Sequence, residues 1–92
     1  MKNPIIVDVT FGSPDIVVST MMHVTDDAPP VGTIITNLGP VPLEILQYVL
    51  DGSSSKLYAK CRLRAKPYPD KEMLRLFQEL EWELVEDHPD LL

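Results

Sequence analysis

The chain has 92 residues, of which 45% are hydrophobic, and it carries a formal net charge of −6. Its length predicts a single α+β domain over residues 1–92 with a short flexible tail at 88–92, and its hydrophobic content excludes a largely disordered chain. The acidic balance disfavours general nucleic-acid binding, because phosphate repels such a chain, and it is compatible with solubility or with a cationic partner.

The first 24 residues predict an antiparallel β-hairpin. In the first run, apolar residues alternate with other residues at a period of two, which is typical of a strand. A turn cluster at 12–15 joins this run to a second alternating run at 16–24. The alternating residues of the two runs are Ile5, Val7, Val9 and Phe11, followed by Ile16, Val18, Thr20, Met22 and Val24.

The middle of the chain predicts a weak strand followed by a helix. Residues 31–36 can form a short third strand, although Gly32 weakens it. Pro42 suits the first turn of a helix, where the missing N–H is not needed. Apolar residues then recur at helical spacing, namely Leu43, Leu46 and Leu50, and the run ends at Asp51 and Gly52.

Residues 56–66 read KLYAKCRLRAK, so cations and an aromatic residue alternate with apolar residues. We expect a strand whose apolar side chains face the core, because burying the cations instead would cost several kcal/mol each. The outward cations can protect a sheet edge, pair with acidic groups of the same chain or of a second copy, or contact an anionic partner. The candidate residues for an anionic partner are Lys60, Arg62, Arg64 and Tyr58.

The C-terminal segment predicts a second helix, which starts near the candidate N-cap Asp70 and is closed by His88 and Pro89. Trp82 would lie opposite the apolar stripe of this helix, where it is either half-covered by the tail or a loop, or contacts a partner. The stripe consists of Met73, Leu76, Phe77, Leu80 and Leu84. The predicted partner-binding residues are Trp82, Leu74, Val85, Gln78, Glu79, Glu83 and Glu86.

These elements follow the order β-β-(β)-α-β-α. The order predicts an α+β two-layer sandwich, in which a mainly antiparallel sheet carries two helices on one face. The opposite face of the sheet would be open to water or to a partner.

No catalytic or metal-binding motif stands out, so we expect no enzyme activity, no metal and no cofactor. The single cysteine, Cys61, lies on the apolar parity of its strand, which predicts a buried and unreactive thiol. Two clusters lack the spacing of a zinc site: His23 with Asp26 and Asp27, and Asp87 with His88 and Asp90.

A cytoplasmic location is expected. One cysteine cannot form an internal disulfide, which fits a reducing compartment. The opening MKNPIIVDVTF has neither a long apolar run nor a small-residue cleavage site, so we expect no signal peptide. The longest apolar runs are too short to span a membrane.

The leading hypothesis is a non-enzymatic regulatory protein that binds another protein, in the manner of an inhibitor, an adaptor, an antitoxin or a phage-encoded regulator. It would use its acidic C-terminal helix or the open sheet face, the partner would have a cationic surface, and a homodimer is an alternative use of the same surface. The second hypothesis is nucleic-acid binding through the basic strand at 56–66.

Overall fold

The computed structural model describes residues 3–13, 15–24 and 27–85. These residues form one sheet with the strand order β3-β4-β5-β1-β2-β6, and one helix. Neighbouring strands are antiparallel except for β1 and β5, which are parallel. The elements are β1 Asn3–Phe11, β2 Ile16–Val24, β3 Ile34–Ile35, β4 Leu43–Asp51, β5 Lys56–Leu63, α1 Asp70–Glu79 and β6 Glu83–Leu84.

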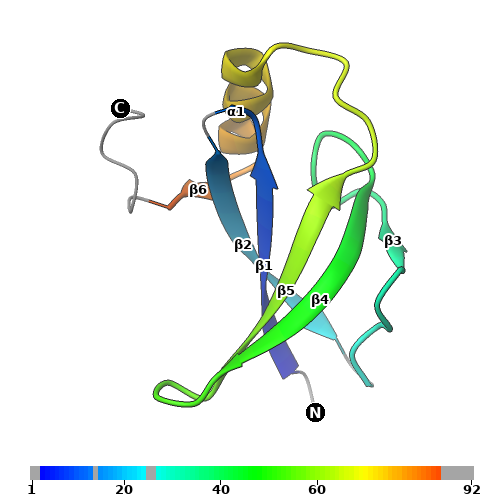
Figure 1. Cartoon of the computed structure of the whole chain (residues 1–92), viewed down its shortest axis with the longest axis vertical. Helices are drawn as coiled ribbons and strands as arrows, with labels where there is room; N and C mark the ends of the chain where they lie inside the picture. Colours follow the sequence, from blue (N-terminus) through cyan, green and yellow to red (C-terminus); the bar gives the residue numbers. More distant parts are fainter. Residues whose placement is uncertain (1–2, 14, 25–26, 86–92) are drawn as a thin grey trace.

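The predicted two-layer sandwich with two helices is wrong. Strands make up 48% of the structure and helices 13%, so this is a mostly-strand fold. The sheet curls into a half-barrel, and α1 lies at the end of the sheet where β1 ends and β2 begins (Figure 1). The element order is β-β-β-β-β-α-β, because the first predicted helix is a strand and a sixth strand follows α1.

The segment predicted as the first helix forms strand β4. Leu43 and Ile45 are buried and face the core, as expected for alternate residues of a strand. The register with β5 shifts between Ile45 and Gln47, and Leu46 at this irregularity is 46% exposed. The leucine spacing that resembled a helical face therefore arises from a strand that contains one extra residue.

The last helix is shorter than predicted because a Schellman motif ends it after Glu79. The N–H of Trp82 donates to the carbonyl of Phe77 and the N–H of Glu81 donates to the carbonyl of Gln78, each over 3.0 Å. Glu81 adopts the left-handed conformation that the motif needs, with φ of 68°. This turn carries Trp82 into the core, where its ring packs edge-on against Phe77 with centroids 4.9 Å apart.

Asp70 is the first residue of α1, and Pro69 occupies the N-cap position predicted for Asp70. The Asp70 carboxylate accepts a hydrogen bond from the N–H of Ser13 over 3.4 Å and forms an ion pair with Lys66. Gly12 has φ of 88°, and a Cβ atom at this position would lie 2.9 Å from Asp70 Oδ2. The turn of the first hairpin thus closes directly over the start of α1, and a larger residue would separate them.

Other expectations are confirmed. The first hairpin pairs β1 with β2 throughout, the weak third strand exists as two residues, and the alternating basic run is extended over Lys56–Leu63. Its apolar residues Ala59 and Cys61 are buried. The buried core consists of Ile5, Val7, Val9, Phe11, Val18, Leu43, Ile45, Ala59, Cys61, Met73, Phe77 and Trp82.

Candidate functional site: the open face of the sheet

The face of the sheet that points away from the core carries a continuous row of apolar side chains across four strands. The register places Val49 opposite Tyr58, Tyr58 opposite Ile6, and Ile6 opposite Met21. Side chains of directly opposed residues project from the same face of a sheet. Met21 is 55% exposed and Val49 is 39% exposed, while Ile6 and Tyr58 are half-buried. We call these four residues the apolar row.

The apolar row departs from the usual alternation of buried apolar and exposed polar side chains along a strand. Ile6 lies between Ile5 and Val7, which are both buried, so its own side chain must point to the other face. Met21 is likewise an outward residue of β2, opposite Ile6. Outward positions of a sheet that faces water are normally polar. The chain therefore places apolar side chains on the sheet face that is opposite the core.

A polar row lies beside the apolar row, two residues further along β1 and β5. In this row Lys60 is opposite Asp8, Asp8 is opposite Ser19, and Ser19 is opposite Glu83. Lys60 Nζ lies 2.7 Å from Asp8 Oδ2 and 5.4 Å from the ring centroid of Tyr58. The ammonium group pairs with a carboxylate whose residue is only 7% exposed, and it also makes a cation–π contact with the tyrosine ring of the apolar row.

Two further cations, Arg62 of β5 and Arg64 in the segment after it, are also paired. Arg62 Nη2 and Arg64 Nη1 lie 2.8 Å and 3.1 Å from the same oxygen, Oε1 of Glu44. Hydrogen bonds from Arg62 and then Arg64 favour the charged carboxylate and lower the pKa of Glu44. The predicted anion-binding residues Lys60, Arg62 and Arg64 thus share two carboxylates of the same sheet face, Asp8 and Glu44. These three cations of the basic run are paired with acidic groups of the same chain.

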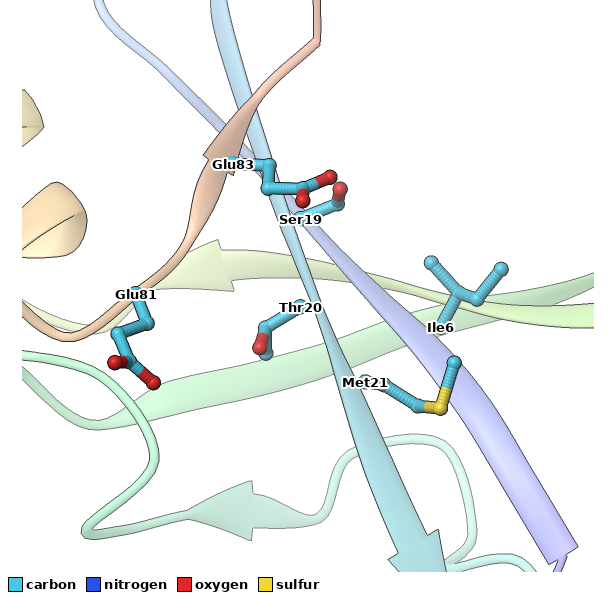
Figure 2. Close-up of a pocket in the computed structure, with 6 residues that line it drawn as sticks. All are labelled: Ile6, Ser19, Thr20, Met21, Glu81 and Glu83. Carbon is cyan, nitrogen blue, oxygen red and sulfur yellow. The ribbon is translucent and has the colours of Figure 1, made fainter.

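A hollow of about 250 Å³ lies at the edge of β2, where β6 begins. Figure 2 shows Ile6 and Met21 on one side of the β2 backbone, and Thr20 and Glu81 on the other. The hydroxyl of Ser19 and the carboxylate of Glu83 complete the lining and point in the same direction (Figure 2). The hollow therefore joins one end of the apolar row to two carboxylates.

The predicted partner-binding surface around Trp82 does not exist as one helical face. Trp82 is 3% exposed, and its Nε1 donates a hydrogen bond to the carbonyl of Leu38 over 3.1 Å. Leu74 and Val85 are half-buried. The prediction treated residues 70–87 as one helix, and the left-handed turn at Glu81 invalidates that geometry.

The other members of the predicted surface are dispersed. Gln78 and Glu79 are exposed on α1, where Glu79 pairs with Arg75. Glu83 is exposed on β6, beside the hollow. Glu86 lies outside the described residues. Among the described members of the predicted surface, Glu83 adjoins the open sheet face.

Sequence reasoning missed the apolar row and Glu81. A signal for the row was present, since Ile6 and Met21 occupy positions of their strands where strict alternation would place polar residues. No signal marked Glu81, because glycine or asparagine is usual at the left-handed position of a helix C-terminus.

The described residues offer little for nucleophilic or metal chemistry. Burial, followed by the charge of Asp8, raises the pKa of the Cys61 thiol to about 11, as fits the predicted unreactive cysteine. No group of three or more His, Cys, Asp or Glu side chains that could hold a metal ion occurs in residues 3–13, 15–24 and 27–85. Asp26 and the cluster of Asp87, His88 and Asp90 lie outside those residues.

Comparisons of the chain with protein-family models, with curated proteins and with solved structures gave no match. Among the described residues, no helix is long and apolar enough to cross a membrane.

Proposed function

We propose that this chain is a non-catalytic, cytoplasmic regulatory module that binds a protein partner through the open face of its sheet. The apolar row is the contact centre, and the polar row with its Lys60–Asp8 pair is one side of the rim. The partner presents an apolar patch flanked by cations, and binding obstructs or recruits that partner.

The observation that carries this proposal is the uninterrupted register of four apolar residues across β4, β5, β1 and β2. An exposed apolar patch rimmed by polar residues is a common feature of protein interfaces. Its aromatic member, Tyr58, belongs to a residue type enriched at binding hot spots. The ammonium of Lys60 lies 5.4 Å from the centroid of the Tyr58 ring, and this cation–π attraction favours one ring orientation, which lowers the entropy lost when a partner binds.

The charges near the apolar row favour a cationic partner over a nucleic acid. The chain has a net charge of −6, and Glu81 and Glu83 line the hollow at one end of the row. A phosphate would have to displace Glu44 from Arg62, or Asp8 from Lys60, before it gained either cation. Nucleic-acid binding through the basic strand thus has less support than protein binding.

The test is a comparison of captured proteins between the wild-type chain and two matched variants. Met21→Asp places a charge in the apolar row, whereas Val31→Asp changes a valine of similar exposure, 58% against 55%, in the loop before β3. We expect a protein that the wild type and Val31→Asp retain to be lost by Met21→Asp. Direct titration of that purified protein should reproduce the difference.

Two results would contradict the proposal. Retention of the same proteins by Met21→Asp would show that the apolar row is not the contact. Loss of retention after nuclease treatment would show that nucleic acid is the bound species. Sedimentation must also show that Met21→Asp leaves the oligomeric state unchanged, since a dimer that this variant dissociates would mean that a second copy occupies the row.

A further inference from the structure

We infer that the partner adds an extended strand to the open edge of β2 at residues 20–24, with alternating cationic and apolar side chains. This inference rests on the proposed function, because the apolar row ends at the same edge. It adds two things that protein binding by the sheet face does not imply: the binding mode and the chemical class of the bound segment.

The backbone of β2 provides the first part of the argument. β1 pairs with β2 along its whole length, whereas β6 pairs only with Val18 and Ser19. The N–H of Val85 donates to the carbonyl of Val17 over 2.9 Å, so the odd-numbered residues of β2 direct their backbone groups toward β6. Met21 and His23 continue that series, and no strand of the described chain lies opposite them.

An edge of this kind is a template for another strand, because its N–H and C=O groups are spaced for an extended partner. β6 already uses the first part of the edge, so an added segment would continue the line that β6 begins. The hollow of about 250 Å³ lies at this point. An added backbone therefore has both a row of hydrogen-bonding groups and space for its side chains.

The lining of the hollow specifies the side chains. Successive residues of a strand point to opposite faces, so an added segment has two different rows of neighbours. One face meets Ile6 and Met21, which favours apolar residues, and the other meets Thr20 and Glu81, which favours cations (Figure 2). In residues 3–13, 15–24 and 27–85, neither Glu81 nor Glu83 forms an ion pair. Glu81 is therefore available to the row of cations, and Glu83, on the face of Ile6 and Met21, is available to a cation where the segment meets β6.

The backbone of Glu81 supports this reading independently. A glutamate with φ of 68° is strained, and glycine would serve the helix end better. Strained residues that the surrounding structure maintains are concentrated at binding sites and catalytic sites. The carboxylate of Glu81 at the rim of the hollow gives a reason for a glutamate at this position.

The same carboxylates argue against a second copy of this chain. Two β2 edges paired with each other would bring the Glu81 and Glu83 side chains of both copies to one interface. Like charges across an interface are unfavourable, and each copy already has a net charge of −6. A cationic segment of another protein removes this repulsion.

The experiment uses the full chain and a short fluorescein-labelled peptide in which lysine and valine alternate. Fluorescence anisotropy should show binding, and a peptide of equal composition with its lysines and valines in two blocks should bind about tenfold more weakly or worse. Two further versions of the alternating peptide carry backbone N-methyl groups, one version on the lysines and the other on the valines. Each version blocks the N–H groups along one edge of the extended peptide. Only one of the two versions should retain affinity, because strand addition uses one edge of the peptide.

Two variant pairs test the charges. Glu81→Gln with Glu83→Gln should reduce the affinity for the alternating peptide by about tenfold. Glu72→Gln with Glu79→Gln removes the same charge from α1 and should leave the affinity within about twofold. Amide exchange at Met21 and His23 should slow by about tenfold or more in the complex.

The inference fails if the alternating peptide does not bind, if both N-methylated versions bind equally, or if the amides of Met21 and His23 remain unprotected in the complex. Those results would leave the proposed function intact if the purified native partner still lost affinity for Met21→Asp. Conversely, a native partner indifferent to Met21→Asp would remove the proposed function, even where the peptide bound the β2 edge.

Discussion

Replacement of Glu81 by glycine should stabilise the protein. Glu81 has φ of 68°, and a non-glycine residue in the left-handed region costs about 1–2 kcal/mol. Glycine also makes the unfolded chain more flexible, which offsets about 0.4–1 kcal/mol of this gain. The expected net stabilisation is therefore roughly 0.5–1 kcal/mol, which corresponds to an increase in Tm of about 2–8 °C for a domain of this size.

The carboxylate of Glu81 contributes separately, because a negative charge near a helix C-terminus is unfavourable by about 0.3–1 kcal/mol. Glu81→Ala removes that charge and keeps the Cβ atom, so the difference between the glycine and alanine variants isolates the backbone strain. Urea and thermal unfolding can be followed by the fluorescence of Trp82, which is buried beside Phe77 and is the single tryptophan.

A glycine variant no more stable than the alanine variant would refute the argument from φ. It would mean that Glu81 is not left-handed in solution, and the Schellman motif that directs Trp82 into the core would lose its support. If the strain has a binding role, the glycine variant should also bind the alternating peptide more weakly while being more stable.

Three further predictions concern the core and the outer face. Trp82→Ala should destabilise the fold by about 3–5 kcal/mol, whereas Trp82→Phe should destabilise it less, because phenylalanine lacks the indole N–H but keeps an aromatic ring against Phe77. Urea unfolding followed by circular dichroism measures both variants, and a loss below about 1 kcal/mol for Trp82→Ala would contradict the burial of Trp82. Because the pKa of the Cys61 thiol is raised to about 11, roughly one molecule per thousand should carry the thiolate at pH 8. Cys61 should therefore react with a thiol reagent only after unfolding, and rapid labelling of the native protein would contradict this prediction. Arg62 and then Arg64 lower the pKa of Glu44, so the ionised Glu44 carboxylate stabilises the fold above the ordinary glutamate pKa. That stabilisation is lost as the pH falls from about 5 through the folded-state pKa. In Glu44→Gln the urea midpoint should therefore fall less steeply with decreasing pH than in the wild type, and an equally steep fall would contradict the pairing.

Local patterns predicted those elements whose side chains follow a single period. The first hairpin alternates over both strands, and a short turn limits its pairing, so the register with β2 follows from local chemistry. The basic run was also predictable, because cations cannot enter the core without a large desolvation cost. The burial of Cys61 followed from the same alternation.

The two errors have different physical causes. In β4, the register irregularity beside Leu46 displaced the leucines from a period of two to an apparent helical spacing, and pairing with β5 determined the outcome. In α1, the apolar pattern continued past the real end, and a glutamate occupied the place where glycine would have indicated the stop. Packing of Trp82 against Phe77 accompanies the turn that local propensity disfavours.

The candidate site shows the same division. The sequence by itself determined that the chain is acidic, that its basic strand faces outward, and that an open sheet face was a possible contact surface. Only the tertiary structure placed Val49, Tyr58, Ile6 and Met21 in one row, because residues from four strands become neighbours through pairing that spans distant parts of the chain. It also decided which carboxylates neutralise the basic strand and which remain beside the edge of β2, since ion pairs depend on where side chains meet in space.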